Sequence, residues 1–141
     1  MTTPILLAVD INDLASSDHL AQAAIALARA QGAKIHVLNV IPGSGMAMVG
    51  AYLGADQEKR IRAEARAKLA DWAERVLPED VFAGLHVTQG TIYHEIIGAA
   101  NRLSASAIVV GAHRPALKDY LVGPNAARVV RHASQTVLVV R

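Results

Sequence analysis

Two glycines near the C-terminal end of the chain flank the residues with the clearest potential for chemistry. The apolar, β-branched run at 107–110 ends at Gly111, and the next residues include His113 and Arg114. Gly123 then precedes a short predicted helix. A loop between a buried strand and a helix N-terminus can hold phosphate, because free backbone N–H groups and the helix dipole point at one place. Glycines are also common turn residues, so the spacing alone leaves both interpretations open.

Asp10 is a second candidate, near the other end of the chain. It follows the apolar run 5–9, which is typical of a central parallel strand buried on both faces. A carboxylate in this position either caps the following turn or accepts a hydrogen bond from a ligand.

His113 and Arg114 also have two interpretations. Beside a phosphate site, such side chains would supply charge-assisted hydrogen bonds, which are stronger than neutral ones. Otherwise both are ordinary solvated loop residues.

The remaining residues exclude several kinds of site. Six histidines are present, but neither H-E-x-x-H nor a histidine pair at i, i+4 with a carboxylate occurs. With no cysteine there is no thiolate nucleophile or Cys-based metal centre. No G-x4-G-K-[ST] phosphate loop is found. We therefore predict no metal site and no P-loop enzyme.

Composition indicates an ordered globular protein. Apolar residues make up 52% of the 141 residues and charged residues 18%, with a net charge of +2. No cluster of Lys and Arg interleaved with aromatics points to nucleic acid. No apolar run is long enough to span a bilayer, and the first residues lack the charged region of a signal peptide. We expect a soluble protein without membrane insertion, which suits the cytoplasm.

Short apolar runs alternate with helical periodicity along the chain. We predict strands at 5–9, 34–41, 85–88, 107–110 and 136–140, and helices starting at Ser17 or Asp18, at Asp56, at Thr91 and at Pro124. A small-residue connection from Pro42 to Ala55 separates the second strand from the longest helix. It is either a partner surface or a loop with a few apolar anchors. The alternation predicts an α/β fold, a parallel sheet with helices on both faces.

The C-terminal stretch resembles the signature of the universal stress protein family, G-x2-G-x9-G-[ST], found in that family's nucleotide-binding members. Gly111 matches the first glycine and Gly123 the last, and the residues 125–133 and 137–141 fit closely. The His-Arg-Pro run at 113–115 is more similar to the enterobacterial F and G branch than to the A branch. The resemblance extends over residues 1–141 and implies one universal stress protein domain.

The match departs from the family pattern in the phosphate-binding loop. Arg114 replaces the second glycine, Pro124 replaces the phosphate-binding Ser or Thr, and the spacer 115–122 is one residue short. Proline suits the first helical position, but it removes an N–H and a hydroxyl that a triphosphate would use. We expect backbone N–H groups from Gly123, Asn125 and Ala126 to remain, and the Asn125 amide to be a candidate replacement for the hydroxyl.

The resemblance also implies where a nucleotide would bind. The family has a single open sheet with the strand order 3-2-1-4-5. This order would place the binding crevice between strands one and four, with Asp10 and Gly111 facing each other across it. The Ala8-Val9-Asp10 run matches the family segment whose Asp contacts adenosine. Val40 corresponds to a residue whose backbone meets the adenine, although its side chain is equally well explained as core.

Two functions follow from these features, and a third is disfavoured. The first is a cytoplasmic stress-response regulator that binds ATP, AMP or ADP, with Mg²⁺ accompanying ATP. No general base stands beside an attacking water, so we expect at most slow ATP hydrolysis, and action through a protein partner. The alternative is a dimeric interaction module that does not bind nucleotide. A phospho-acceptor domain is disfavoured, because the third strand ends in Thr88-Gln89 and not in an acceptor Asp.

The position of the last strand, 136–140, indicates that the protein forms an oligomer. In the implied order it lies at the sheet edge, where unpaired N–H and C=O groups invite aggregation unless they are covered. A two-fold partner pairing the same strand would cover it, and the resemblance implies a homodimer, or a higher oligomer, through this strand. The alternative is a monomer whose last helix and neighbouring loop shield the edge.

Overall fold

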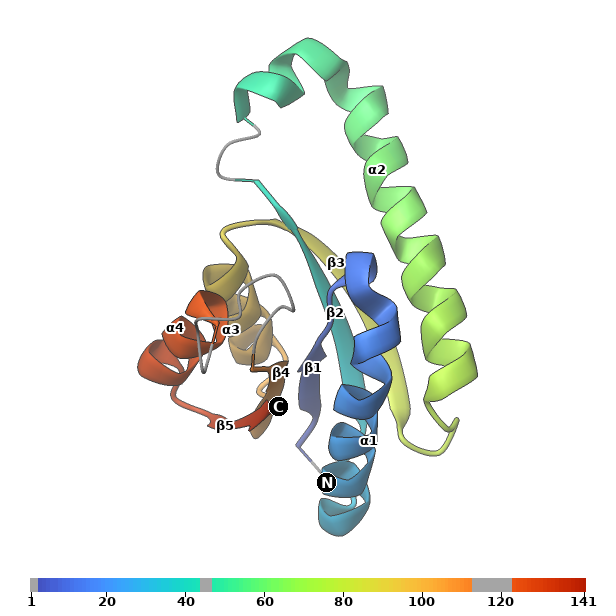
Figure 1. The fold of residues 1–141 in the computed structure, drawn as a ribbon, viewed down its shortest axis with the longest axis vertical. Coiled ribbons are helices and arrows are strands. Elements are labelled where there is room, and N and C mark those ends of the chain that lie inside the picture. Colours follow the sequence, from blue (N-terminus) through green and yellow to red (C-terminus); the bar gives the residue numbers. More distant parts are fainter. Residues whose placement is uncertain (1–2, 44–46, 113–122) are drawn as a thin grey trace.

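The computed structural model describes residues 3–43, 47–112 and 123–141. Within them the chain forms a five-stranded parallel sheet with the order β3-β2-β1-β4-β5 (Figure 1). The strands are β1 Ile5–Ala8, β2 Ile35–Pro42, β3 Phe82–Gly90, β4 Ala107–Gly111 and β5 Thr136–Val140. The predicted α/β fold and strand order are confirmed, and β5 lies at one edge of the sheet.

Helices cover both faces of the sheet. The helices α1 Leu14–Gln31 and α2 Ala47–Val76 lie on one face, and α3 Ile92–Arg102 and α4 Pro124–His132 lie on the other (Figure 1). A short 3-10 turn, η1 Ile11–Asp13, links β1 to α1. Among the described residues, no helix combines the length and the apolar character needed to cross a membrane.

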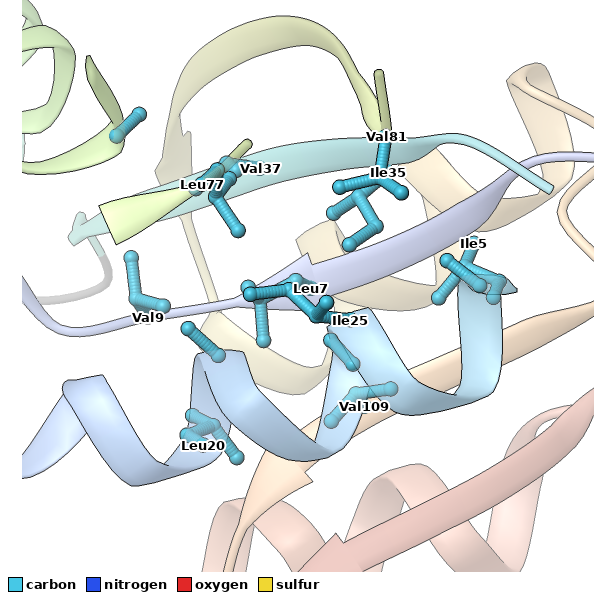
Figure 2. Close-up of a cluster of buried hydrophobic side chains, with 14 of the residues drawn as sticks. Ile5, Leu7, Val9, Leu20, Ile25, Ile35, Val37, Leu77, Val81 and Val109 are labelled. Carbon is cyan, nitrogen blue, oxygen red and sulfur yellow. The ribbon is translucent and has the colours of Figure 1, made fainter. Parts of the chain in front are cut away.

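The larger core cluster lies between the sheet and α1 and α2. Figure 2 shows Leu7 of β1 next to Ile25 of α1, with Val109 of β4 beside them, and Val37 of β2 next to Leu77. Leu7, Val37 and Val109 are fully buried. Continuous apolar runs are what parallel strands covered on both faces require, so β1 and β4 are anchored firmly at the centre of the sheet.

The second core cluster lies on the opposite face, under α3 and α4. Leu6, Leu38 and Ile108 point from the sheet toward Ile96 of α3 and Val129 of α4, and all five side chains are buried. Because strand side chains alternate between faces, adjacent residues such as Leu6 and Leu7 serve different clusters. Both ends of the β4–α4 connection are thereby fixed against the core.

The start of α1 and the extent of β3 differ from the sequence prediction by more than two residues. Helix α1 begins at Leu14, so Ser17 lies inside its first turns and does not cap it. The Ser17 hydroxyl donates to the Asp13 carbonyl oxygen at 3.1 Å, which ties the helix to η1. The strand β3 extends over nine residues, because its backbone pairs with the whole length of β2. Gly84 hid the first part of β3, since glycine is depleted in strands.

The connection predicted between Pro42 and Ala55 is helical from Ala47 onward. Gly54 interrupts α2 with φ 81° and ψ 166°, a conformation that glycine adopts readily. The predicted helix start at Asp56 therefore corresponds to the segment after this kink. Periodicity could not show the first segment, because its small residues gave no clear apolar stripe.

Candidate functional site

A cavity of about 680 Å³ opens at the carboxyl ends of the strands. It is lined by the segment after β1, the end of β2, the end of β4 and the start of α4. The strand order reverses between β1 and β4, and ligands of open α/β sheets bind at such a point. The cavity volume lies within the range of about 300–1,000 Å³ that is usual for small-molecule sites.

The described site residues predicted from the sequence all line this one cavity: Ala8, Val9, Asp10, Val40, Gly111, Gly123, Pro124, Asn125 and Ala126. The structure thus brings together residues from the two ends of the chain. His113 and Arg114 lie outside the described residues, so the structure does not place them.

The loop after β1 is held by two side-chain acceptors. Asp10 caps η1, since its carboxylate accepts the Asn12 N–H at 2.9 Å. The Asn39 side chain of β2 accepts a hydrogen bond from the Ile11 N–H at 3.2 Å. Asn39 is only 3% exposed. Asp10 is half-buried on the cavity wall, so capping the turn and facing the cavity are compatible.

The start of α4 presents backbone donors to the cavity. Gly123 is the N-cap, Pro124 follows in the first turn, and no side chain of the described residues caps the helix. The Gly123 N–H donates to the Ala112 carbonyl oxygen, so the expectation that it remains free was wrong. The first intrahelical bond is donated by Ala127 to Gly123 at 3.0 Å. The N–H groups of Asn125 and Ala126 come before it, so they have no partner within the helix.

An apolar wall completes the cavity on the α3 side. It is formed by Leu38 and Val40 of β2, Ile92 and Ile96 of α3, and Val110 of β4. The Val40 side chain also packs against the second core cluster, which agrees with the reading of this side chain as core. A flat apolar group beside polar donors is the kind of ligand such a wall fits.

Several polar lining residues were not predicted. Ser16 and His19 of α1, Lys68 of α2 and Arg141 reach the wall on the α1 and α2 side. The His19 Nε2 atom contacts the Arg141 carbonyl oxygen, which brings α1 to the end of β5. Helical periodicity could identify these positions as exposed but could not indicate which cavity they border. Asn39 did carry a signal, as a polar residue inside an apolar strand.

No three His, Cys, Asp or Glu side chains of the described residues form a group that could hold a metal ion. The cavity wall carries the carboxylates of Asp10, Asp13 and Glu64 and the cations of Lys68 and Arg141. The apolar wall can hold an apolar group, and the N–H groups at the start of α4 can hold an anionic one despite the three carboxylates.

Comparison with known proteins agrees with this architecture. The family model described as "Universal stress protein family" matches residues 1–141. Universal stress protein G of Shigella flexneri is 31% identical over 143 residues, with the whole of both chains covered.

Two solved structures of universal stress proteins in complex with nucleotides share the fold. The universal stress protein from Archaeoglobus fulgidus in complex with dAMP is 22% identical, with a TM-score of 0.67, covering 99% of this chain and 98% of that one. A universal stress protein in complex with cAMP is 22% identical with a TM-score of 0.59, covering 100% and 98%. The whole-length family match, together with the fold, assigns the chain: it belongs to the universal stress protein family.

Proposed function

We propose that this protein is a cytoplasmic, single-domain stress-response regulator that binds an adenine nucleotide in the cavity between β1 and β4. One observation carries the proposal: Asp10, the apolar wall and the N–H groups at the start of α4 that have no partner within the helix border the same cavity. A nucleoside has an apolar base and a polar ribose, and a phosphate is stabilised by free N–H groups at a helix N-terminus.

The adenine is assigned to the apolar wall. Val40 and Ile92 border the cavity there, and the exposed backbone at the end of β2 supplies polar atoms for the edge of a base. Asp10 then accepts a hydrogen bond from the ribose. The dAMP and cAMP complexes of structural neighbours support an adenine nucleotide as the ligand class.

The phosphate is assigned to the start of α4. Asn125 and Ala126 supply two N–H groups, and the helix dipole adds a partial positive charge. Pro124 has no N–H and no hydroxyl, and the Gly123 N–H already donates to Ala112. With few donors left for outer phosphates, the discrimination between ATP and AMP is smaller than in family members with Ser or Thr at this position. ATP would bring Mg²⁺ with it.

The regulation is assigned to protein contacts and not to catalysis. In the predicted site no side chain has the role of a general base beside an attacking water, so hydrolysis is at most slow. The edge strand β5 is proposed to pair with its copy in a homodimer. Among the described residues two large hydrophobic side chains are exposed, Val130 of α4 at 52% and Leu138 of β5 at 36%. The exposed Leu138 supports an interface at β5.

A second function is a dimeric interaction module that binds no nucleotide. It is favoured by the same observation that weakens the phosphate site, namely that Gly123 donates to Ala112 while Pro124 has no donor. The two functions share the fold and the dimer, so they differ only in what occupies the cavity.

The experiment that separates the two is direct. Purified protein is denatured, and any released nucleotide is identified by chromatography and mass spectrometry. Apo protein is then titrated with AMP, ADP, ATP and, as a base control, GMP by calorimetry. Adenine nucleotide in the released fraction, or binding of AMP well above GMP, supports the proposal. No released nucleotide together with no heat of binding would contradict the proposal and favour the interaction module.

A further inference from the structure

Two histidines that are fifty positions apart in the sequence meet on the sheet. His36 lies in β2 and His86 in β3, and the Nδ1 atom of His36 is 2.9 Å from the Nε2 atom of His86. Their ring centroids are 5.1 Å apart, with the planes tilted by 42°. His36 pairs with Gly84, and Leu38 pairs with His86, so the two histidines are diagonal neighbours on adjacent strands.

The two rings lie on the face that α3 covers. Side chains of a strand alternate between faces, so His36 shares its face with Leu38, a member of the second core cluster. Both histidines are half-buried. The pair therefore stands apart from the cavity, whose lining includes neither histidine.

Gly84 lies beside the two ring nitrogens that point at each other, His36 Nδ1 and His86 Nε2. A Cβ atom at this position would lie 3.5 Å from His36 Nδ1 and 4.0 Å from His86 Nε2. Because the residue is glycine, the space next to the two nitrogens is free of its side chain. A larger side chain would fill that space.

We propose that His36 and His86 form a two-imidazole site for a divalent first-row transition metal, with Cu²⁺, Ni²⁺ and Zn²⁺ as the candidates. Imidazole suits these metals, whereas Mg²⁺ and Ca²⁺ prefer oxygen ligands. With metal–nitrogen distances of about 2.0–2.1 Å, two ligands of one ion lie roughly 3.0–3.4 Å apart. The observed 2.9 Å is close to this separation, and both rings must turn from the hydrogen-bonded orientation so that their lone pairs converge on one ion.

Metal binding here needs no net loss of a proton. In the hydrogen-bonded pair one neutral imidazole donates its N–H to the other, which accepts it. On binding, the donor ring moves its hydrogen to its second nitrogen through water, and both facing lone pairs then coordinate the ion. Among the described residues no third His, Cys, Asp or Glu completes a protein-only site. Water occupies the remaining positions, and affinity is moderate.

The electrostatic surroundings act in two ways. Burial lowers the pKa of both histidines below 6.5, and for His86 the neighbouring His36, Arg66 and Arg102 lower it further. This keeps the imidazoles neutral, which metal ligation requires. The same arginines repel a cation, so a metal that binds imidazole strongly, Cu²⁺ above all, is favoured.

The test uses EDTA-treated full-length protein, titrated with CuCl₂ and ZnCl₂ by calorimetry in a non-coordinating buffer. His36→Gln and His86→Gln should each weaken Cu²⁺ binding by about tenfold or more, on the scale of a lost ligand. The double variant His94→Gln/His132→Gln removes the same number of imidazoles from the exposed surfaces of α3 and α4. It should leave the affinity unchanged.

A second variant keeps both imidazoles. Gly84→Val fills the space beside the facing nitrogens and should also abolish the site, whereas MgCl₂ should give no binding to any form. Wild-type protein with ¹⁵N-labelled histidine provides a readout that does not depend on variant folding, because Zn²⁺ should shift the ring signals of His36 and His86 first. Affinity that survives both single variants, or Zn²⁺ shifts at other histidines first, would overturn the proposal.

Discussion

Asn39 and Ile11 are joined by a hydrogen bond across 28 positions of sequence, with the Ile11 N–H 3.2 Å from the Asn39 Oδ1 atom. It links the loop after β1 to the interior of β2, where Asn39 is almost fully buried. Asp10, which is proposed to bind the ribose, immediately precedes Ile11. The orientation of the Asp10 side chain therefore depends on the buried Asn39 amide.

Asn39→Ala should therefore destabilise the protein and loosen the loop. The Ile11 N–H loses its acceptor, and an unsatisfied buried group costs about 1–3 kcal/mol. Urea unfolding measures the free energy, and AMP titration measures the accompanying loss of affinity. Asn101→Ala is the matched control, since exposed Asn101 accepts a bond from Gln135 at 2.7 Å and does not line the cavity. Equal destabilisation in both variants would contradict the argument.

Asp10→Ala should weaken adenine nucleotide binding by about 1–3 kcal/mol, the usual range for a lost or orphaned hydrogen bond. Asp10→Asn separates the two roles of this side chain, because the amide oxygen can still accept the Asn12 N–H. Calorimetry with AMP should place Asp10→Asn between wild type and Asp10→Ala. Asp71→Ala, an exposed carboxylate of α2, is the control. Unchanged affinity in Asp10→Ala would remove Asp10 from the site.

Apolar runs were sufficient to predict the strands and their parallel arrangement, and the strand order came from the family resemblance. The buried β1 and β4 read directly as continuous apolar segments. In contrast, residues 82–84 at the start of β3 were not predicted as strand, because Gly84 interrupts the pattern. Pairing with β2, a long-range contact, decides that segment.

The candidate site was predictable in part. Asp10, Gly111 and Gly123 were found because family resemblance placed them in one crevice. Asn39 and Lys68 depend on how α2 and the loop after β1 pack, which periodicity does not encode. The hydrogen bond from the Gly123 N–H to Ala112 was also hidden, since it depends on the path of the chain between β4 and α4.

Pro124→Ser should raise ATP affinity more than AMP affinity. The variant restores an N–H and a hydroxyl at the start of α4, and serine is a good residue for donating to phosphate there. Parallel titrations with ATP and AMP measure the two gains. Pro124→Ala is the control that restores the N–H alone. An equal gain for both nucleotides, or no gain, would show that outer phosphates do not contact this position.

Stability should fall as the pH decreases below the ordinary histidine value. The pKa values of His36 and His86 are lowered in the folded state, chiefly by burial. The unfolded chain then binds more protons just below pH 6.5, so the contribution of the neutral pair is complete above that pH and is lost on acidification. Urea unfolding across this range should show a shallower pH dependence in His36→Gln/His86→Gln than in wild type. Identical slopes would contradict the pair's role.

The proposed dimer makes a prediction about single backbone groups of β5. Val140 directs its carbonyl oxygen to the Ala112 N–H of the β4 side at 2.7 Å. Because the backbone groups of successive strand residues point to opposite sides, Val139 directs its N–H to the free edge. Proline is tolerated on an edge strand where the N–H faces outward. Val139→Pro should therefore remove a bond of the dimer while leaving β5 paired with β4.

Leu138→Pro is the contrasting variant. The backbone N–H of Leu138 points toward β4, so removing it should break the pairing of the two strands and unfold β5. Sedimentation at micromolar concentration should give a dimer for wild type and a monomer for Val139→Pro, whose circular dichroism stays native. Leu138→Pro should instead lose its native spectrum. A monomeric wild type would mean that the edge is shielded within one chain, and a Val139→Pro variant that stays dimeric would place the interface away from β5.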